Sequence, residues 1–350
     1  MKMKRRIALL LVAVLVMGVL AGCGGDKSDG ADAPEGDQPA KGGTTFLSIA
    51  TGGTGGTYYP LGGALSNIFN GSDMGLQATA QSTGASVENV ELIHNGEAEI
   101  AFIQNDIAYY AFNGIELFGE GEIEKDGKVE KREKREYPDI RGLCTLYPEV
   151  VQIIAADGSG IESVEDMKGK KVAVGAPGSG TEVNARQVLA AHGLTYDDLG
   201  KADYLSFSEA TDQIKNGQVD AAFVVAAIPS SSVTELATTH DIHLVPIAED
   251  KANALIADYP YYTYMDIQPG DYKGQEEPVA AVAVQAMLIV NESMDEDLVY
   301  NLTKNMFENL NVIEESHARG KDITLESALE GMSIELHPGA KKFFDEEGIK

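Results

Sequence analysis

Two glycine-rich segments, each between a predicted strand and a predicted helix, carry the residues best suited to bind a ligand. Residues 51–59 read Thr-Gly-Gly-Thr-Gly-Gly-Thr-Tyr-Tyr, and residues 175–181 read Gly-Ala-Pro-Gly-Ser-Gly-Thr. Glycines let the backbone approach a ligand closely, and a helix start offers unpaired N–H groups with partial positive charge. Serine and threonine hydroxyls add further donors. Together they predict a site for a carboxylate or phosphate that needs no basic side chain.

The candidate contacts extend from these loops to residues 81–86 and to the end of the strand at 104. In a single loop, capping by Ser or Thr would explain the composition equally well, but two loops in matching positions favour binding. Asn184 lies one turn into the second helix, on the face of its first residues. The predicted ligand contacts are Thr54, Gly55, Gly56, Thr57, Tyr58, Ser82, Thr83, Ser86, Gln104, Gly178, Ser179, Gly180, Thr181 and Asn184.

Several catalytic and metal-binding motifs fail on detail. A Walker loop needs a Lys, yet Thr181 follows Gly180 directly, and the dinucleotide fingerprint is incomplete. A nucleophile elbow needs one residue between Ser179 and each flanking glycine, and none is there. His240 and His243 have ligand-like spacing but no third ligand follows them. We therefore expect no catalytic residue, no metal and no cofactor.

The elements that position the loops alternate between strand and helix, which predicts an α/β fold with mostly parallel strands. Strands are predicted at 45–50, 76–81, 99–104, 171–175, 202–207 and 220–225, and helices at 60–69, 87–94, 181–192 and 208–215. The segment 93–102 (Ile-His-Asn-Gly-Glu-Ala-Glu-Ile-Ala-Phe) resembles 214–223 (Ile-Lys-Asn-Gly-Gln-Val-Asp-Ala-Ala-Phe), so the unit is repeated. Two lobes of like topology would face each other across a cleft.

The lobes are predicted to comprise residues 44–150 plus 284–350 (lobe I) and 151–283 (lobe II). The apolar runs 150–156 and 279–290 would cross between them as hinges, and the helical tail from 296 would pack on the first lobe. Residues 116–136 are dense in charge and predict a solvated loop or a surface helix. Cys144 has apolar neighbours, which indicates a packed side chain.

The start of the chain is typical of a bacterial lipoprotein signal. Basic residues at 2–6 precede an apolar run at 7–20, and Leu-Ala-Gly comes directly before Cys23. We expect a signal peptide at 1–22, lipidation of Cys23 and a flexible tether at 23–43, so the protein would be membrane-anchored outside the cytoplasm. Loss of four basic residues from a net charge of −28 leaves about −32, which disfavours nucleic acid and anionic lipid as partners.

Residues 51–63, 174–182 with Ala185 and Arg186, and His-Pro-Gly-Ala at 337–340 resemble the TAXI group of solute-binding proteins of tripartite ATP-independent periplasmic (TRAP) transporters. The resemblance covers almost all of the chain after the signal. It implies a two-lobed periplasmic-binding fold of the second type with two hinge crossings, a TRAP permease as partner, and glutamate or a related small dicarboxylate as ligand. It also implies that both loops and residues 81–86 contact that ligand. Arg186 belongs to the motif, but its helical position predicts a surface pair.

The sequence thus predicts a solute receptor, with two alternatives. One is a receptor of the same fold that serves an ATP-driven importer or a sensor kinase and binds phosphate or another oxyanion. The other is a secreted hydrolase, although no triad partner is present. In the receptor, Ser179 and Thr181 are expected to donate hydrogen bonds to the ligand.

Overall fold

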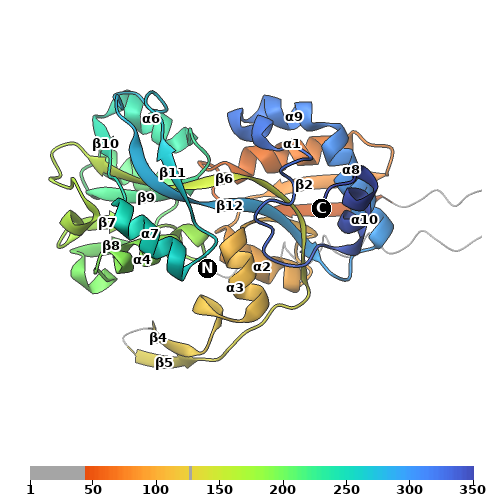
Figure 1. Cartoon of the computed structure of the whole chain (residues 1–350), viewed down its shortest axis with the longest axis horizontal. Helices are drawn as coiled ribbons and strands as arrows, with labels where there is room; N and C mark the ends of the chain where they lie inside the picture. The colour runs from red at the N-terminus through yellow and green to blue at the C-terminus, as the bar shows by residue number, and fades with distance from the viewer. Residues whose placement is uncertain (1–43, 126–127) are drawn as a thin grey trace, which may run out of the picture. The chain divides into compact units, whose positions relative to one another are not determined.

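A mixed ten-stranded sheet runs through the computed structural model, which describes residues 44–125 and 128–350 (Figure 1). Along the sheet the strands follow the order β2-β1-β3-β12-β6-β9-β7-β8, with β10 paired to β6 and β11 paired to β12. The predicted signal peptide, the lipidation site at Cys23 and the tether lie outside the described residues.

The first half of the chain forms a parallel unit close to the one predicted. The strands are β1 (Thr45–Ala50), β2 (Leu76–Gln81) and β3 (Ile100–Gln104), and the helices are α1 (Tyr58–Asn70), α2 (Ser86–His94) and α3 (Asn105–Asn113). β1 lies between β2 and β3 and pairs with both in parallel. The carboxyl ends of these strands therefore meet at one edge, where the first glycine loop begins.

The second unit has the same order of elements. Its strands are β7 (Lys171–Ala173), β8 (Lys201–Asp203) and β9 (Ala221–Ala226), and its helices are α4 (Gly180–Ala191), α5 (Phe207–Lys215), α6 (Ser231–Thr239) and α7 (Glu249–Asp258). β7 pairs in parallel with β8 and β9. The predicted strand at 202–207 is too long, because Ser206 and Glu209 form a capping box that starts α5.

Two long antiparallel strands connect the two units, in agreement with the prediction of two runs that cross between the lobes. β6 (Ile140–Ala156) and β12 (Val279–Asn291) lie side by side in the middle of the sheet (Figure 1). β12 pairs with β3 on one side, and β6 pairs with β9 on the other. The short strands β10 (Ile242–Leu244) and β11 (Thr263–Ile267) extend this crossing. The predicted fold class, a two-lobed type II periplasmic-binding fold with two crossing strands, is confirmed, while the residue boundaries of the lobes stay a prediction.

Separate hydrophobic clusters fill the two sides of the crossing. Phe102 packs with β1, α1 and the C-terminal helices α8 (Glu296–Glu308) and α10 (Pro338–Glu347), so the tail does pack on the first unit. Phe223 belongs to a second cluster with β7 and α4. Cys144 is fully buried in the first cluster, which confirms its packing role, and burial raises the pKa of its thiol.

The prediction of a loop or helix at 116–136 is wrong. After a short 3-10 turn at Glu116–Phe118, the chain forms an antiparallel hairpin of β4 (Gly121–Lys125) and β5 (Lys128–Arg132). The sequence between these strands is Asp-Gly, which is a strong signal for a two-residue hairpin turn. The prediction relied instead on the high density of charge in this segment.

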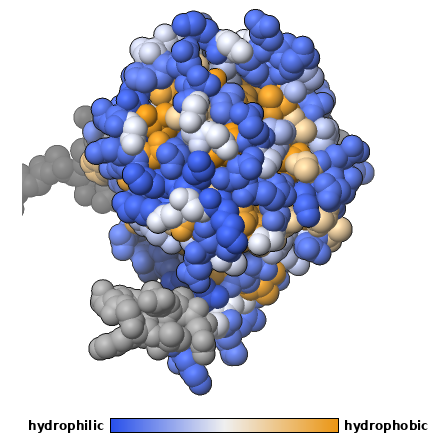
Figure 2. Space-filling view, turned by 90° about the vertical axis from the view of Figure 1, so that its left-hand side faces the viewer, coloured by the Kyte–Doolittle hydropathy of each residue, from blue (hydrophilic) through white to orange (hydrophobic). Residues whose placement is uncertain are grey.

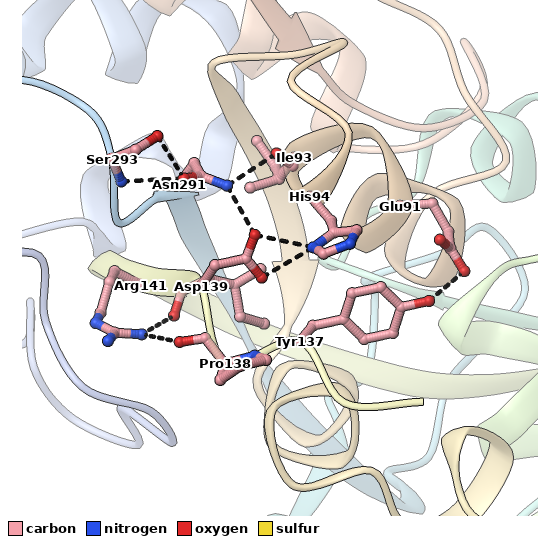
Figure 3. Close-up of polar contacts among 10 residues, drawn as sticks. Glu91, Ile93, His94, Tyr137, Pro138, Asp139, Arg141, Asn291 and Ser293 are labelled. Atoms are coloured by element: carbon pink, nitrogen blue, oxygen red, sulfur yellow. Dashed lines mark hydrogen bonds and ion pairs between the residues drawn. The ribbon is translucent and has the colours of Figure 1, made fainter. Parts of the chain in front are cut away.

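A polar cluster fixes the C-terminal end of α2 to both crossing strands (Figure 3). His94 Nδ1 lies 2.9 Å from Asp139 Oδ2, just before β6. Asn291, the last residue of β12, donates from Nδ2 to Asp139 Oδ2 (3.0 Å) and to Ile93 O (3.2 Å). Tyr137 OH donates to Glu91 Oε1. The orientation of α2 is therefore set by the strands that cross between the lobes.

The surface is largely polar on the face drawn in Figure 2. The face that turns toward the viewer in Figure 2 is mainly hydrophilic, with small apolar patches between polar residues. Within residues 44–125 and 128–350, no helix combines the length and the apolar character that crossing a membrane requires.

Candidate functional site

A cavity of about 70 Å³ lies where the starts of four helices converge. A single buried water needs about 10–15 Å³, so the space suits a small solute or several waters. The cavity is lined by Gly52, Gly53, Gly56, Thr57, Tyr58, Thr83, Gly84, Ala85, Ser86, Gln104, Glu149, Ala176, Ser179, Gly180, Thr181, Ser206, Phe207, Val225 and Ala226. Both glycine loops and part of 81–86 therefore lie together, as predicted.

The helix starts give the cavity a positive potential without a basic side chain. α1, α2, α4 and α5 each begin at a residue that lines the cavity, namely Tyr58, Ser86, Gly180 and Phe207. The first N–H groups of a helix lack partners within that helix and carry partial positive charge, although at α2 two of them donate to Gly178 O (3.0 and 3.2 Å). None of the described lining residues is Lys, Arg or His. The electrostatics favour an anion bound by backbone dipoles.

Thr57 is the clearest unfilled group of the first loop. The residue is 3 % exposed, its side chain does not cap α1, and its Oγ1 has no hydrogen-bond partner among the residues that the structure describes. The loop around it is held by Asn89, whose Nδ2 donates to Thr51 O (2.7 Å) and Phe102 O (2.8 Å). A buried hydroxyl without a partner costs free energy, which a bound ligand would recover.

In the second loop, Ser179 already forms hydrogen bonds to its neighbours in the chain. Ser179 Oγ donates to Ala176 O (2.7 Å) and accepts from Glu182 N (3.2 Å), so its hydrogen is already used. The expectation that Ser179 donates to a ligand does not fit this geometry, because its hydrogen is donated to Ala176 O while the oxygen accepts the N-cap bond of α4. Gly180 and Thr181 still line the cavity.

Asn184 acts behind the cavity rather than in it. It is fully buried, and its Nδ2 donates to Asp106 Oδ2 (3.0 Å) and Tyr262 OH (2.7 Å). Its Oδ1 accepts from Gln104 Nε2 (3.0 Å), so Asn184 on α4 joins two residues of the first unit. Burial raises the pKa of Asp106 to about 6, while the bond from Asn184 lowers it.

Four other predicted contacts also lie outside the cavity lining. Thr54 is exposed, and Ser82 donates to Gly52 O (3.0 Å), which shapes the first loop. Gly55 O accepts from Ser231 Oγ (3.0 Å), and Gly178 O accepts from the backbone N–H groups at the start of α2 (3.0 and 3.2 Å). The last two contacts join the first unit to the second, so the structure is closed around the cavity. Arg186 forms the expected surface pair with Glu182.

Glu149 is a cavity residue that the sequence analysis missed. It lies in β6 and is 3 % exposed, and its Oε2 accepts from Tyr58 OH (2.5 Å). Burial raises the pKa of Glu149 to about 8, against the lowering effect of Tyr58, and burial also raises the pKa of Tyr58. A single carboxylate directly before the predicted apolar run at 150–156 was the available signal, since an unpaired carboxylate is costly to bury and often marks a functional site.

The comparisons with known proteins give a family and weak structural similarities. The sequence profile described as the NMT1-like family matches residues 49–348. Among solved structures, the periplasmic aliphatic sulphonate binding protein SsuA from Escherichia coli is 14% identical, with a TM-score of 0.43 over 79% of this chain and 74% of that one. PhnD1 from Prochlorococcus marinus in complex with methylphosphonate is 9% identical, with a TM-score of 0.48 over 80% and 89%. A binding protein component of an ABC phosphonate transporter from Pseudomonas aeruginosa is 13% identical, with a TM-score of 0.43 over 79% of each chain.

Proposed function

The chain belongs to the NMT1-like family, and from this premise we propose that it is an extracytoplasmic solute-binding protein that closes two lobes around a small anion. The observation that carries the proposal is the closed cavity at four helix starts, which holds the unpartnered Thr57 hydroxyl and no basic lining residue among those described. Backbone N–H groups and helix dipoles would bind the negative charge.

Closure would couple binding to transport. The walls of the cavity come from α1 and α2 on one side and from α4 and α5 on the other, while β6 and β12 connect them. A ligand that touches both walls stabilises the closed arrangement relative to the open one. The closed surface would then dock on a membrane permease.

Two ligand classes are candidates. The sequence resemblance to TAXI receptors supports a carboxylate, glutamate or a related dicarboxylate, delivered to a TRAP permease. The three similar structures are a sulphonate-binding protein, a protein in complex with methylphosphonate and a component of an ABC phosphonate transporter, which agrees instead with an oxyanion receptor for an ATP-driven importer. Their similarity to this chain concerns the fold alone. A permease gene or an ATPase gene beside this one would separate the two partners.

Lipidation of Cys23 remains part of the proposal. An acylated cysteine followed by the Gly- and Ser-containing stretch 24–43 would keep the receptor close to the permease. Metabolic labelling with a fatty acid would test it, and a Cys23→Ala variant should lose the label. An enzyme is not proposed: the hydroxyl of Ser179 bonds to Ala176 O and Glu182 N and not to a base.

The main test is binding of small anions by the purified protein. The chain has no Trp, so calorimetry is the suitable readout. The panel comprises L-glutamate, L-glutamine, 2-oxoglutarate, an alkanesulfonate and methylphosphonate, after mass spectrometry of gently purified protein for a retained ligand. Binding of at least one member, weakened by Gly180→Ala, would support the proposal. If no small anion is bound or retained, the receptor function is wrong.

A further inference from the structure

We propose that Glu149 contacts the ligand as a neutral carboxylic acid, whose O–H donates a hydrogen bond to the bound anion, so that a proton and the ligand occupy the closed cavity together. This role rests on the proposed function and adds to it, since it gives one cavity residue a task and makes the affinity depend on pH. It applies to a carboxylate and to a sulfonate alike, and it requires no basic side chain.

The position of Glu149 leaves one oxygen of its carboxyl for a solute. The residue lies in β6, is 3 % exposed and lines the cavity. Its Oε2 accepts from Tyr58 OH (2.5 Å), whereas Oε1 forms no hydrogen bond with any residue of the described ranges. The residue opposite Glu149 in β12 is the apolar Val284, which offers no side-chain partner. Oε1 is therefore the oxygen available to a bound ligand.

No positively charged side chain faces this carboxyl among the described residues. The titratable groups that face it are Tyr58 from α1, Tyr147 from β6 and Asp106 from α3, and none of the described lining residues is Lys, Arg or His. A buried carboxyl without a cation is costly to ionise. Burial accordingly raises the pKa of Glu149 to about 8; the hydrogen bond from Tyr58 opposes this shift, and the charge of Asp106 adds to it. At pH 7 most molecules therefore carry a proton on Glu149.

A bound anion strengthens the preference for the neutral form. The cavity of about 70 Å³ brings any solute close to Glu149. An ionised Glu149 would repel the anion and would compete with it for the partial positive charge of the helix starts. A neutral carboxyl removes this repulsion and offers one O–H donor. Because hydrogen bonds from an O–H group to an ionised acceptor are short and strong, the neutral form is the one that binds the anion.

The affinity should then depend on pH with a defined sign. Well below pH 8 the ligand-free protein already holds the proton on Glu149, so binding has its full strength. As the pH rises above 8, binding must also take up a proton, so the dissociation constant should increase by about tenfold per pH unit. Asp106, which lies behind the cavity, has a pKa of about 6 and is largely ionised throughout this range. An ionised Glu149 that accepts from the ligand would give the opposite trend.

Two variants of similar side-chain size separate the donor from the charge. Glu149→Gln offers an N–H donor that does not titrate, and its amide oxygen can still accept from Tyr58. Glu149→Met has no such donor. Binding of L-glutamate, 2-oxoglutarate, an alkanesulfonate and methylphosphonate is measured by calorimetry at pH 7, 8 and 9. At pH 7 we expect Glu149→Gln to bind within about threefold of the wild type and Glu149→Met to bind at least about fivefold more weakly. Circular dichroism and thermal unfolding verify that both variants fold.

The comparison of the wild type with Glu149→Gln cancels the ionisation of the solute itself. From pH 7 to pH 9 the ratio of their dissociation constants, wild type over variant, should rise about tenfold, because only the wild type loses its donor. At pH 8.5 the wild type should take up at least about half a proton more per ligand, detected from the dependence of the heat on buffer ionisation enthalpy. A merely structural Glu149 would give neither effect. With 2-oxoglutarate or an alkanesulfonate, whose charge is constant in this range, proton uptake by the wild type alone provides the test if a variant does not fold.

The outcomes distinguish the role of Glu149 from the receptor function. A ratio that stays constant or falls as the pH rises would overturn the donor role. The same holds if Glu149→Gln loses as much affinity as Glu149→Met, or if Glu149→Met binds like the wild type. Each of these results leaves the receptor function intact, because an anion is still bound. Absence of binding of every probe, with no ligand retained on purification, would overturn the receptor function itself.

Discussion

Replacing Gly180 by Ala should block closure of the two lobes without harming either lobe. Gly180 is the first residue of α4 and does not have a positive φ, so its backbone accepts Ala. The added Cβ would overlap Gln104 Oε1 and would lie 2.5 Å from Gln104 Cδ and 3.2 Å from Ile107 Cγ1, both on the opposite wall. Gln104 is held by Asn184 and by its own backbone bond to Ser86 Oγ (3.2 Å), so it cannot simply turn away.

The cost should fall on the closed arrangement alone. Overpacking by one methyl group in a tight interior costs about 1–3 kcal/mol. Since every 1.4 kcal/mol is a factor of ten, the ligand dissociation constant should rise by about 5- to 150-fold. Separating the lobes relieves the clash, so the free energy of unfolding measured in urea without ligand should change by less than the binding free energy does.

The matched control is Gly63→Ala, because a Cβ at that position meets nothing within 4 Å. Gly63 lies inside α1, where Ala is favoured over Gly by about 0.5–1 kcal/mol, so this variant should be slightly more stable and should bind like the wild type. Calorimetry with the retained or best-binding anion compares the three proteins. Wild-type affinity in Gly180→Ala would show that the opposing walls do not have to meet in the bound state, and the reasoning would fail.

Three further predictions follow from buried groups. The pKa of Glu149 is about 8 in the folded protein against 4.5 for a free side chain, so the folded state binds more protons between these values and ligand-free stability should fall as pH rises from about 5 to 8. Asp106, with a pKa of about 6, contributes the same sign at lower pH. In Glu149→Gln the free energy of unfolding measured in urea should therefore depend less steeply on pH from about 5 to 8, and the dependence that remains, from Asp106, should end near pH 6. Asn184→Asp sets two carboxylates together at Asp106, so its ligand affinity should drop as pH rises from about 5 to 8; a pH-independent ratio to wild-type affinity would contradict this. Gly339→Ala pushes a Cβ into Glu296 O of α8, so the free energy of unfolding should decrease by about 1–3 kcal/mol, and an unchanged value would argue against the tight α8–α10 packing.

Local signals in the sequence were sufficient for most of the elements. The predicted strands at 45–50 and 76–81 match β1 and β2 at both ends, since short segments with regularly spaced apolar residues between glycine-containing stretches leave little choice. Errors arose where a short-range motif outweighed the hydrophobic pattern, as at the capping box that starts α5 and at the Asp-Gly connection between β4 and β5. Both motifs are present in the sequence, but the predictions gave more weight to the composition of the segments 202–207 and 116–136.

The candidate site was only partly predictable, because hydrogen-bond partners depend on contacts distant in the chain. The glycine loops could be placed in one cleft from strand order alone. The sequence could not decide whether Ser179 caps its own helix or binds a ligand, and it could not tell that Asn184 bonds to Asp106, 78 residues away. The sequence is the same whether the hydroxyl or amide of a side chain faces a ligand or a neighbouring residue.

The sequence by itself determined the repeated strand–loop–helix unit, the two crossing strands and the absence of a basic residue from both glycine loops, because each follows from local pattern and spacing. Tertiary structure alone decided which groups are left without partners. Folding brought Glu149 of a crossing strand beside Tyr58 of the first helix and left Gln104 Oε1 without a hydrogen bond to any residue of the described ranges. Burial is a property of the packed chain, and it turns an ordinary carboxylate and amide into groups that demand a partner.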